Sequence, residues 1–229
     1  MSSGWLSPWA IWDNNLQKWI WKAGDPLIPT WEFPGRDGVV PLVTNSDGKM
    51  INVEHLQSIL AEATDVVVNG EDLSAALPIT FTLVAQPDVP RTISWVFIAH
   101  AQITAYTITF LGVNAKGETI TEVITEADGW TGETSNAFAT ITSIIMSART
   151  GTGALDTMDV GIGGNVGLAG HISAVADVFK VVKSAAAGLA TDYSGAGNVT
   201  AEATYDTVDL VTGAAIVAGD KFTIYYKAS

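Results

Sequence analysis

Apolar and polar residues alternate along most of the chain from about residue 76 onward, as expected for half-buried β-strands. The clearest example has Tyr106, Ile108 and Phe110 alternating with Thr107 and Thr109. Other segments of strand length are rich in Thr, Ile and Val: ITFTLVA, TISWVFI, ETITEVIT, FATITSIIM, DTMDVG, SAVADVFKVVK, NVTAEAT, TVDLV and KFTIYYK. About ten strands are therefore predicted.

Turn signals separate these strands. Residues 114–117, Asn-Ala-Lys-Gly, predict a hairpin loop, and Asp128-Gly129 predicts a second turn. Many short strands joined by such turns indicate a β-sandwich or a jelly-roll-like body. The predicted fold class is therefore mainly β, with this body over residues 76–229.

Residues 51–75 predict a short helix followed by a linker. Asn52 is a suitable N-cap residue for a helix over residues 53–63. The apolar residues that follow at helical spacing are Val53, Leu56, Ile59, Leu60 and Ala63. The linker then leads into the β body.

Residues 1–50 predict an extended N-terminal arm. Five of the eight prolines fall in this range, and proline at that density prevents a regular helix or a central strand. Six of the eight tryptophans also lie here: Trp5, Trp9, Trp12, Trp19, Trp21 and Trp31. Such an arm needs a surface to lie on.

The tryptophans of the arm predict an interaction site. Tryptophan is enriched at binding hot spots because it buries a large rigid surface at little cost in side-chain entropy. Three interpretations stay open: the arm docks on neighbouring subunits, completes the core of its own subunit, or stacks on sugars. Carbohydrate modules usually place aromatic residues on a rigid sheet face or loop, so the pattern favours a protein anchor.

Composition and charge narrow the class of partner. Charged residues make up only 15% of the chain, below the roughly 25% of a typical soluble domain, which suits a subunit that hides surface in an assembly. The net charge of −13 argues against nucleic-acid binding. Residues 1–60 carry a net charge of −2 and residues 61–229 carry −11, so association of the arm meets little repulsion.

Targeting and membrane signals are weak. The chain has no cysteine, and the N-terminus lacks the basic and smoothly apolar regions of a secretory signal. The most apolar window, SWVFIAHAQITAYTITFLGV, shows alternation and polar residues, so two strands are predicted there and no membrane association.

The search for catalytic or metal-binding patterns predicts none. His55, His100 and His171 stand alone, without the spacing of metal ligands. The glycine run over residues 161–167 fails the dinucleotide-binding pattern and predicts a tight loop between strands. Paired carboxylates on the strands suit a solvated face better than glycosidase chemistry. We expect a non-enzymatic protein without catalytic residues, metal or cofactor.

Residues 86–169 resemble structural proteins of tailed-bacteriophage virions. The shared pattern comprises a Pro-Asp-x-Pro-Arg strand start, a G-x-x-x-x-G-E hairpin, an Ala-Phe-x-x-Ile strand and a glycine-rich V-G-x-G-x-x-x-G-L segment. The matching positions are Pro87, Asp88, Pro90, Arg91, Gly112, Gly117, Glu118, Ala137, Phe138, Ile141, Gly161, Gly163, Gly167 and Leu168. The tryptophan-rich arm is outside this pattern.

The resemblance implies a virion protein made in the host cytoplasm. We first expect a head decoration (cement) protein on the capsid surface. Such proteins clamp neighbouring major capsid subunits with their arms and are commonly homotrimers. A tail or neck component is the alternative, and a carbohydrate-binding module is the alternative from another class.

Overall fold

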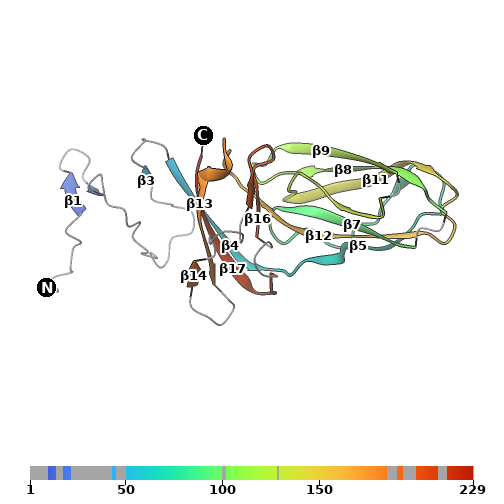
Figure 1. Cartoon of the computed structure of the whole chain (residues 1–229), viewed down its shortest axis with the longest axis horizontal. Helices are drawn as coiled ribbons and strands as arrows, with labels where there is room; N and C mark the ends of the chain where they lie inside the picture. Colours follow the sequence, from blue (N-terminus) through green and yellow to red (C-terminus); the bar gives the residue numbers. More distant parts are fainter. Residues whose placement is uncertain are drawn as a thin grey trace.

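The computed structural model is mainly β. It describes residues 10–13, 18–21, 43–44, 50–99, 102–127, 129–184, 190–192, 200–210 and 216–228. A six-stranded, a four-stranded and a five-stranded antiparallel sheet make up the body. Among the described residues the one helical element is the 3-10 turn η1 (Val175–Asp177). The predicted mainly β fold with a sandwich-like body is confirmed (Figure 1).

Two of these sheets face each other and form the sandwich seen on the right of Figure 1. The six-stranded sheet has the order β10-β7-β12-β16-β15, with β5 also paired to β12. Its strands are β5 (Ala63–Asp72), β7 (Arg91–Ala99), β10 (Thr131–Glu133), β12 (Thr157–Gly167), β15 (Thr200–Glu202) and β16 (Thr207–Asp209). The opposing sheet, in the order β6-β11-β8-β9, has β6 (Ile79–Thr80), β8 (Ala105–Val113), β9 (Thr119–Ala127) and β11 (Thr140–Thr150).

The sandwich encloses the first hydrophobic core. Alternate residues of β8 point inward, so that Tyr106, Ile108 and Phe110 are all buried. Trp95 of the opposing sheet donates its Nε1–H to the hydroxyl oxygen of Tyr106 at 2.9 Å, which satisfies both polar groups inside the core. The alternation in the sequence therefore marks the buried face correctly.

The predicted hairpin over residues 114–117 is also confirmed. It joins β8 to β9, and Gly117 adopts a φ of +81° that glycine tolerates without strain. The side-chain oxygen of Asn114 accepts hydrogen bonds from the backbone N–H groups of Lys116 and Glu118, both at 2.9 Å. These bonds fix the turn locally.

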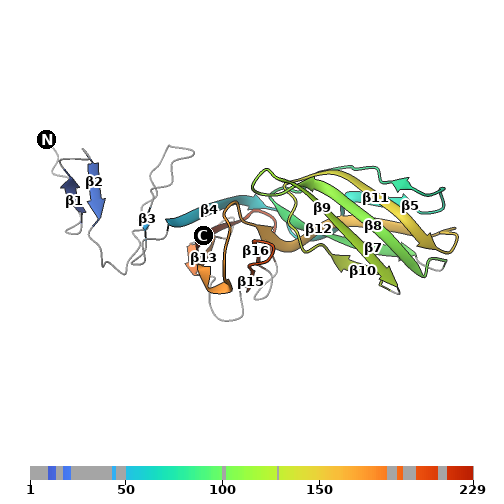
Figure 2. The same ribbon diagram turned by 90° about the horizontal axis from the view of Figure 1, so that it is seen from above.

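The five-stranded sheet encloses a second core beside the sandwich (Figures 1 and 2). Its order is β14-β13-β17-β4-β3, with β3 (Val43–Thr44), β4 (Met50–Ile59), β13 (Val178–Ser184), β14 (Ala190–Asp192) and β17 (Asp220–Lys227). Phe222, Ile224 and Tyr226 of β17 are each 1% exposed and face this core. Val166 and Leu168 extend from the end of β12 into the same cluster, so one long strand serves both cores.

The predicted helix over residues 53–63 is wrong. Residues 50–59 form strand β4, which pairs with β17 about 170 residues later in the chain. The pairing shifts between Phe222↔Leu56 and Asp220↔Ile59, where three residues of β4 span two residues of β17. This β-bulge turns Leu56 and Ile59 toward the same core at a spacing of three, which imitates a helical pattern.

The described part of the N-terminal arm contains a β-hairpin. Strands β1 (Ala10–Asp13) and β2 (Lys18–Trp21) pair with each other in a two-stranded sheet. Both views place this hairpin at one end of the molecule, apart from the sheets of the body (Figures 1 and 2). Within the described residues, neither strand pairs with a strand of the body.

Candidate functional site

The two cores meet at a buried arginine. Arg91, the first residue of β7, has 0% exposure, and its guanidinium donates hydrogen bonds through Nε and Nη2 to the carbonyl oxygen of Gly163. Its Nη1 donates to the carbonyl oxygen of Leu60 at 2.8 Å and lies 3.6 Å from Oδ1 of Asp88. Asp88 Oδ2 in turn accepts the Leu60 N–H at 2.6 Å. We call these four residues the joint.

The joint contains a buried positive charge, the guanidinium of Arg91. Burial lowers the pKa of Arg91, and the negative charges of Asp88, Glu62 and Glu133 oppose part of this shift. Arginine stays protonated in proteins, so the joint retains a positive charge that backbone carbonyls and nearby carboxylates stabilise. Asp88 and Arg91 belong to the Pro-Asp-x-Pro-Arg segment of the sequence, and their contacts in this structure are architectural.

A second polar contact links the cores at the surface. Lys116, in the hairpin of the sandwich, donates to Oδ2 of Asp206 at 2.5 Å. The other oxygen, Oδ1, accepts the N–H of Ile172 and lies 2.8 Å from Nδ1 of His171. Burial alone would raise the pKa of Asp206, but the hydrogen bonds from Lys116, Ile172 and His171 outweigh it and lower the pKa.

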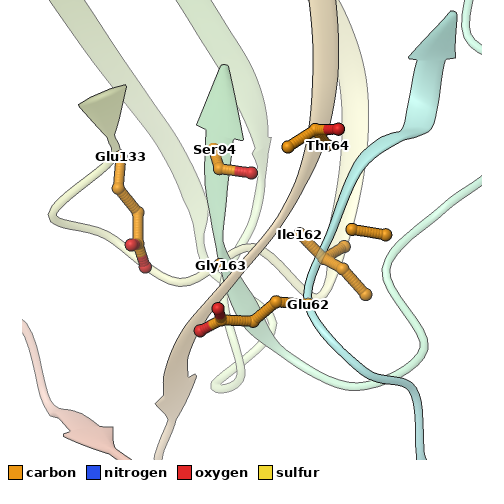
Figure 3. Close-up of a pocket in the computed structure, with 7 residues that line it drawn as sticks. Glu62, Thr64, Ser94, Glu133, Ile162 and Gly163 are labelled. Carbon is orange, nitrogen blue, oxygen red and sulfur yellow. The ribbon is translucent and has the colours of Figure 1, made fainter. Parts of the chain in front are cut away.

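A shallow pocket of about 290 Å³ opens beside the joint. Figure 3 shows Glu62 and Glu133 on either side of Gly163, with their carboxylates directed toward each other. The remaining lining residues are Ala63, Thr64, Ser94 and Ile162. Glu133 accepts hydrogen bonds from the hydroxyl of Thr92 and, at 3.4 Å, from Nδ2 of Asn165. The pocket is the candidate site for chemistry in the described part of the chain.

The two carboxylates of the pocket differ in their environment. Partial burial and the neighbouring charge of Glu133 raise the pKa of Glu62, and Arg91 opposes the shift. Acid–base hydrolysis of glycosides uses two carboxyl groups, of which the general acid has a raised pKa. However, both glutamates are exposed, and none of the seven lining residues is aromatic or offers an apolar platform for a sugar ring. The geometry therefore supports such chemistry weakly.

Asp156, Asp159 and His55 each have a structural partner. Asp156 is fully buried and accepts the backbone N–H groups of Gln102 and Ile103, while Asp159 accepts that of Gly70 at 2.6 Å. His55 lies 3.0 Å from the hydroxyl of Thr223, and His100 lies outside the described residues. Across the described ranges, no cluster of His, Asp and Glu is placed to hold a metal ion.

The predicted loop over residues 161–167 is wrong, because this glycine run forms the second half of strand β12. A Cβ on Gly161 would lie 1.7 Å from the carbonyl oxygen of Ala63, and one on Gly163 would lie 2.1 Å from Oε1 of Glu133. The glycines therefore allow neighbouring segments to approach the strand closely, and Gly163 leaves room for the side chains of Glu133 and Thr92.

The structure brings together three of the six predicted anchor residues. The hairpin pairs Trp12 directly with Trp19, and Trp21 with Ala10. Directly opposite residues and alternate residues of a strand share a face, so Trp12, Trp19 and Trp21 occupy register positions on one face. Trp5, Trp9 and Trp31 lie outside the described residues.

Sequence reasoning missed two features of the site. The pocket glutamates lie 71 positions apart in the sequence, and only the pairing of β5 with β12, β12 with β7 and β7 with β10 brings them near each other. The role of Arg91 had one local signal, an isolated arginine at the start of an apolar strand, which becomes informative once its burial is known.

Comparisons with protein-family models, with curated proteins and with solved structures found no match. Over the described residues, none of the helical structure has the length and apolar character needed to cross a membrane.

Proposed function

We propose that this chain is a non-enzymatic structural subunit of a virion, a capsid decoration protein that bridges neighbouring capsid subunits through its N-terminal arm. The observation that carries the proposal is the hairpin β1–β2, which places Trp12 opposite Trp19 and pairs with no described strand of the body. The virion assignment rests on the sequence resemblance alone, and the anchoring role rests on the hairpin.

An isolated hairpin is a weak structure by itself. A two-stranded hairpin is at best marginally stable in water, and it gains stability when a hydrophobic face packs on another surface. Burying three tryptophan side chains at about 150–250 Å² each would contribute on the order of 10–20 kcal/mol before the cost of ordering the arm. The hairpin is therefore suited to gain stability by packing on a partner.

The body is suited to hold such an anchor. Two cores joined by the buried Arg91 and by the Lys116–Asp206 ion pair form a continuous β scaffold. Strand β3 pairs with β4 at the edge of the five-stranded sheet, so the arm enters the body there. We infer that the scaffold positions the arm and that the protein self-associates as a trimer, which allows several arms to engage one capsid lattice.

The two faces of the hairpin provide the test. Trp12→Ala/Trp19→Ala removes an opposed pair on one face, and Ile11→Ala/Ile20→Ala removes the opposed pair on the other face of the same strands. Each full-length variant is mixed with particles from cells in which the gene is deleted, and co-sedimentation is measured. Binding should weaken about 100-fold or more in the tryptophan variant and much less in the isoleucine variant.

Equal binding of both variants and the unaltered protein would contradict the anchoring role. Saturable quenching of tryptophan fluorescence by a soluble glycan would instead favour the carbohydrate-binding alternative. Particles of the tail or neck that retain the protein, with capsids that do not, would favour the tail component.

A further inference from the structure

The charges of the body are strongly segregated. Residues 61–175, which include most of the sandwich, contain twelve acidic and three basic residues, a net charge of −9. All three of those basic side chains are engaged: Arg91 in the joint, Lys116 with Asp206, and Arg149 with the carbonyls of Leu73 and Ala75. The sandwich therefore carries a net negative charge.

The five-stranded sheet carries the opposite charge. Strands β13 and β17 contain four lysines and one acid, Asp220, whose carboxylate is bound by Lys183 at 2.9 Å. The remaining three lysines, Lys180, Lys221 and Lys227, alternate with the buried residues and so lie on the outer side of the sheet. The outer side of this sheet is therefore positively charged, although the whole chain has a net charge of −13.

Register defines the outer side as one surface. Lys180 pairs with Tyr225 and Tyr225 with Val53, while Val182 pairs with Thr223 and Thr223 with His55. Phe179 lies next to this row, with its ring centroid 6.4 Å from that of Tyr225. We call this surface the basic face; its residues are Val53, His55, Phe179, Lys180, Val182, Lys221, Thr223, Tyr225 and Lys227.

The basic face has the composition of a binding surface. Aromatic and apolar side chains lie at its centre, Phe179 is 36% exposed, and lysines lie around them. By its register with Val182, Asp192 of β14 lies on the same side of the sheet, and it is the one acidic residue there among the described strand positions. Within the described part of the chain, Lys180 and Lys221 have no ion-pair partner.

We propose that the basic face docks on the acidic sandwich of a second copy of this chain. Charge complementarity selects the occupant, because the sandwich offers exposed carboxylates that include Asp65, Asp72, Glu118 and Glu126. Because the two surfaces differ, the contact between copies is head-to-tail. If the rotation that relates successive copies returns to the first copy, the assembly is a closed ring such as a trimer. The inference rests on the proposed function only in treating the chain as a subunit of an assembly, since the hairpin is not part of this contact.

Two variants of equal net charge test the proposal in the full-length chain. Lys180→Gln/Lys221→Gln removes two of the three lysines of the basic face, and Thr119→Glu/Thr121→Glu adds acids at exposed positions of β9 on the sandwich. Each variant has a formal net charge of −15, two units below the −13 of the unaltered chain. Self-association is measured by sedimentation equilibrium from about 0.05 M to about 0.5 M salt, a range over which screening becomes strong.

The lysine variant should associate about 10–100-fold more weakly at low salt, and the threonine variant should associate at least as well as the unaltered chain. Higher salt should weaken association of the unaltered chain and leave the lysine variant nearly unchanged. Equal weakening of both variants would mean general charge repulsion and would overturn the proposal, as would a monomer at every concentration.

The hairpin variants separate this contact from the anchor. The Trp12→Ala/Trp19→Ala variant should lose particle binding but should keep the salt-dependent part of self-association. If particle binding fails to depend on the tryptophans but the lysine variant still dissociates, the anchor is refuted and the head-to-tail contact stands.

Discussion

The guanidinium of Arg91 and the carbonyl oxygen of Leu60, 2.8 Å apart, connect the start of β7 to the segment between β4 and β5. Leu60 lies where the chain passes from the five-stranded sheet into the sandwich. The same guanidinium bonds Gly163 in the middle of β12. One buried side chain thus ties together the segments that cross between the two cores.

Replacing Arg91 should destabilise the whole body. Arg91→Met leaves the carbonyls of Leu60 and Gly163 without their donors, and we expect a loss of about 3–5 kcal/mol in the free energy of unfolding. Arg149→Met is the matched control, because Arg149 also donates to carbonyls but is only half-buried, and we expect about 1 kcal/mol. Urea unfolding monitored by circular dichroism measures both. Equal losses in the two variants would refute the special role of the joint.

Glu54 should reduce stability at neutral pH. Its Oε1 accepts the N–H of Ala169 at 2.7 Å, whereas its buried Oε2 has no hydrogen-bond partner. Burial raises the pKa of Glu54, and the bond from Ala169 opposes the shift. A carboxyl whose pKa is raised by folding loses stability as pH rises from the unfolded value through the folded value.

Glu54→Gln should therefore be more stable than the unaltered protein at pH 7, with the difference shrinking toward pH 4, where both states bind the proton. Thermal melting across this pH range measures the effect. The neighbouring titratable side chain, Tyr226, stays unchanged in the variant. A variant that is less stable at pH 7 than the unaltered protein would contradict the account.

Asp206 should act in the opposite sense. Its pKa is lowered in the folded state, so its contribution is present above the unfolded pKa of about 3.9 and is lost as pH falls through the folded pKa. Asp206→Asn should be less stable than the unaltered protein at pH 7 and should lose less stability on acidification. Parallel stability curves for the two proteins from pH 7 to pH 2 would refute the role of this ion pair.

Close packing at β12 should make Gly161 intolerant of a side chain. Gly161→Ala places Cβ against the backbone carbonyl of Ala63, and a backbone atom cannot rotate away, so we expect a loss of about 1–3 kcal/mol or more. The comparison is Gly117→Ala, which meets open space but has a φ of +81°, and should lose about 1 kcal/mol. Urea midpoints decide the order, and a smaller loss at Gly161 would show that β5 can move away.

The alternation of apolar and polar residues predicted the sandwich well because the two-residue period depends only on the local chain direction. Tyr106, Ile108 and Phe110 face the core where that period places them. The turn over residues 114–117 was equally predictable, because Asn114 and Gly117 determine it locally.

Features set by distant pairing were not predictable. The bulge that brings Leu56 and Ile59 to one face exists only because β4 pairs with β17, so the spacing of three resembled a helix. The glycines of β12 are explained by segments distant in the sequence that pack closely against the strand, including Ala63 of β5. The basic face has three lysines from two strands on one side of a sheet. Only the register of the strands shows that these lysines share a side.

The central claim is that this chain is a structural subunit on the surface of a virion capsid. Imaging native particles from cells that produce the chain, together with particles from a gene deletion, tests it most directly. We expect the deletion to remove one discrete β-rich density from the capsid surface, with an aromatic hairpin inserted between neighbouring capsid subunits. Native particles whose capsids are unchanged by the deletion, including those in which only the tail changes, would contradict the claim.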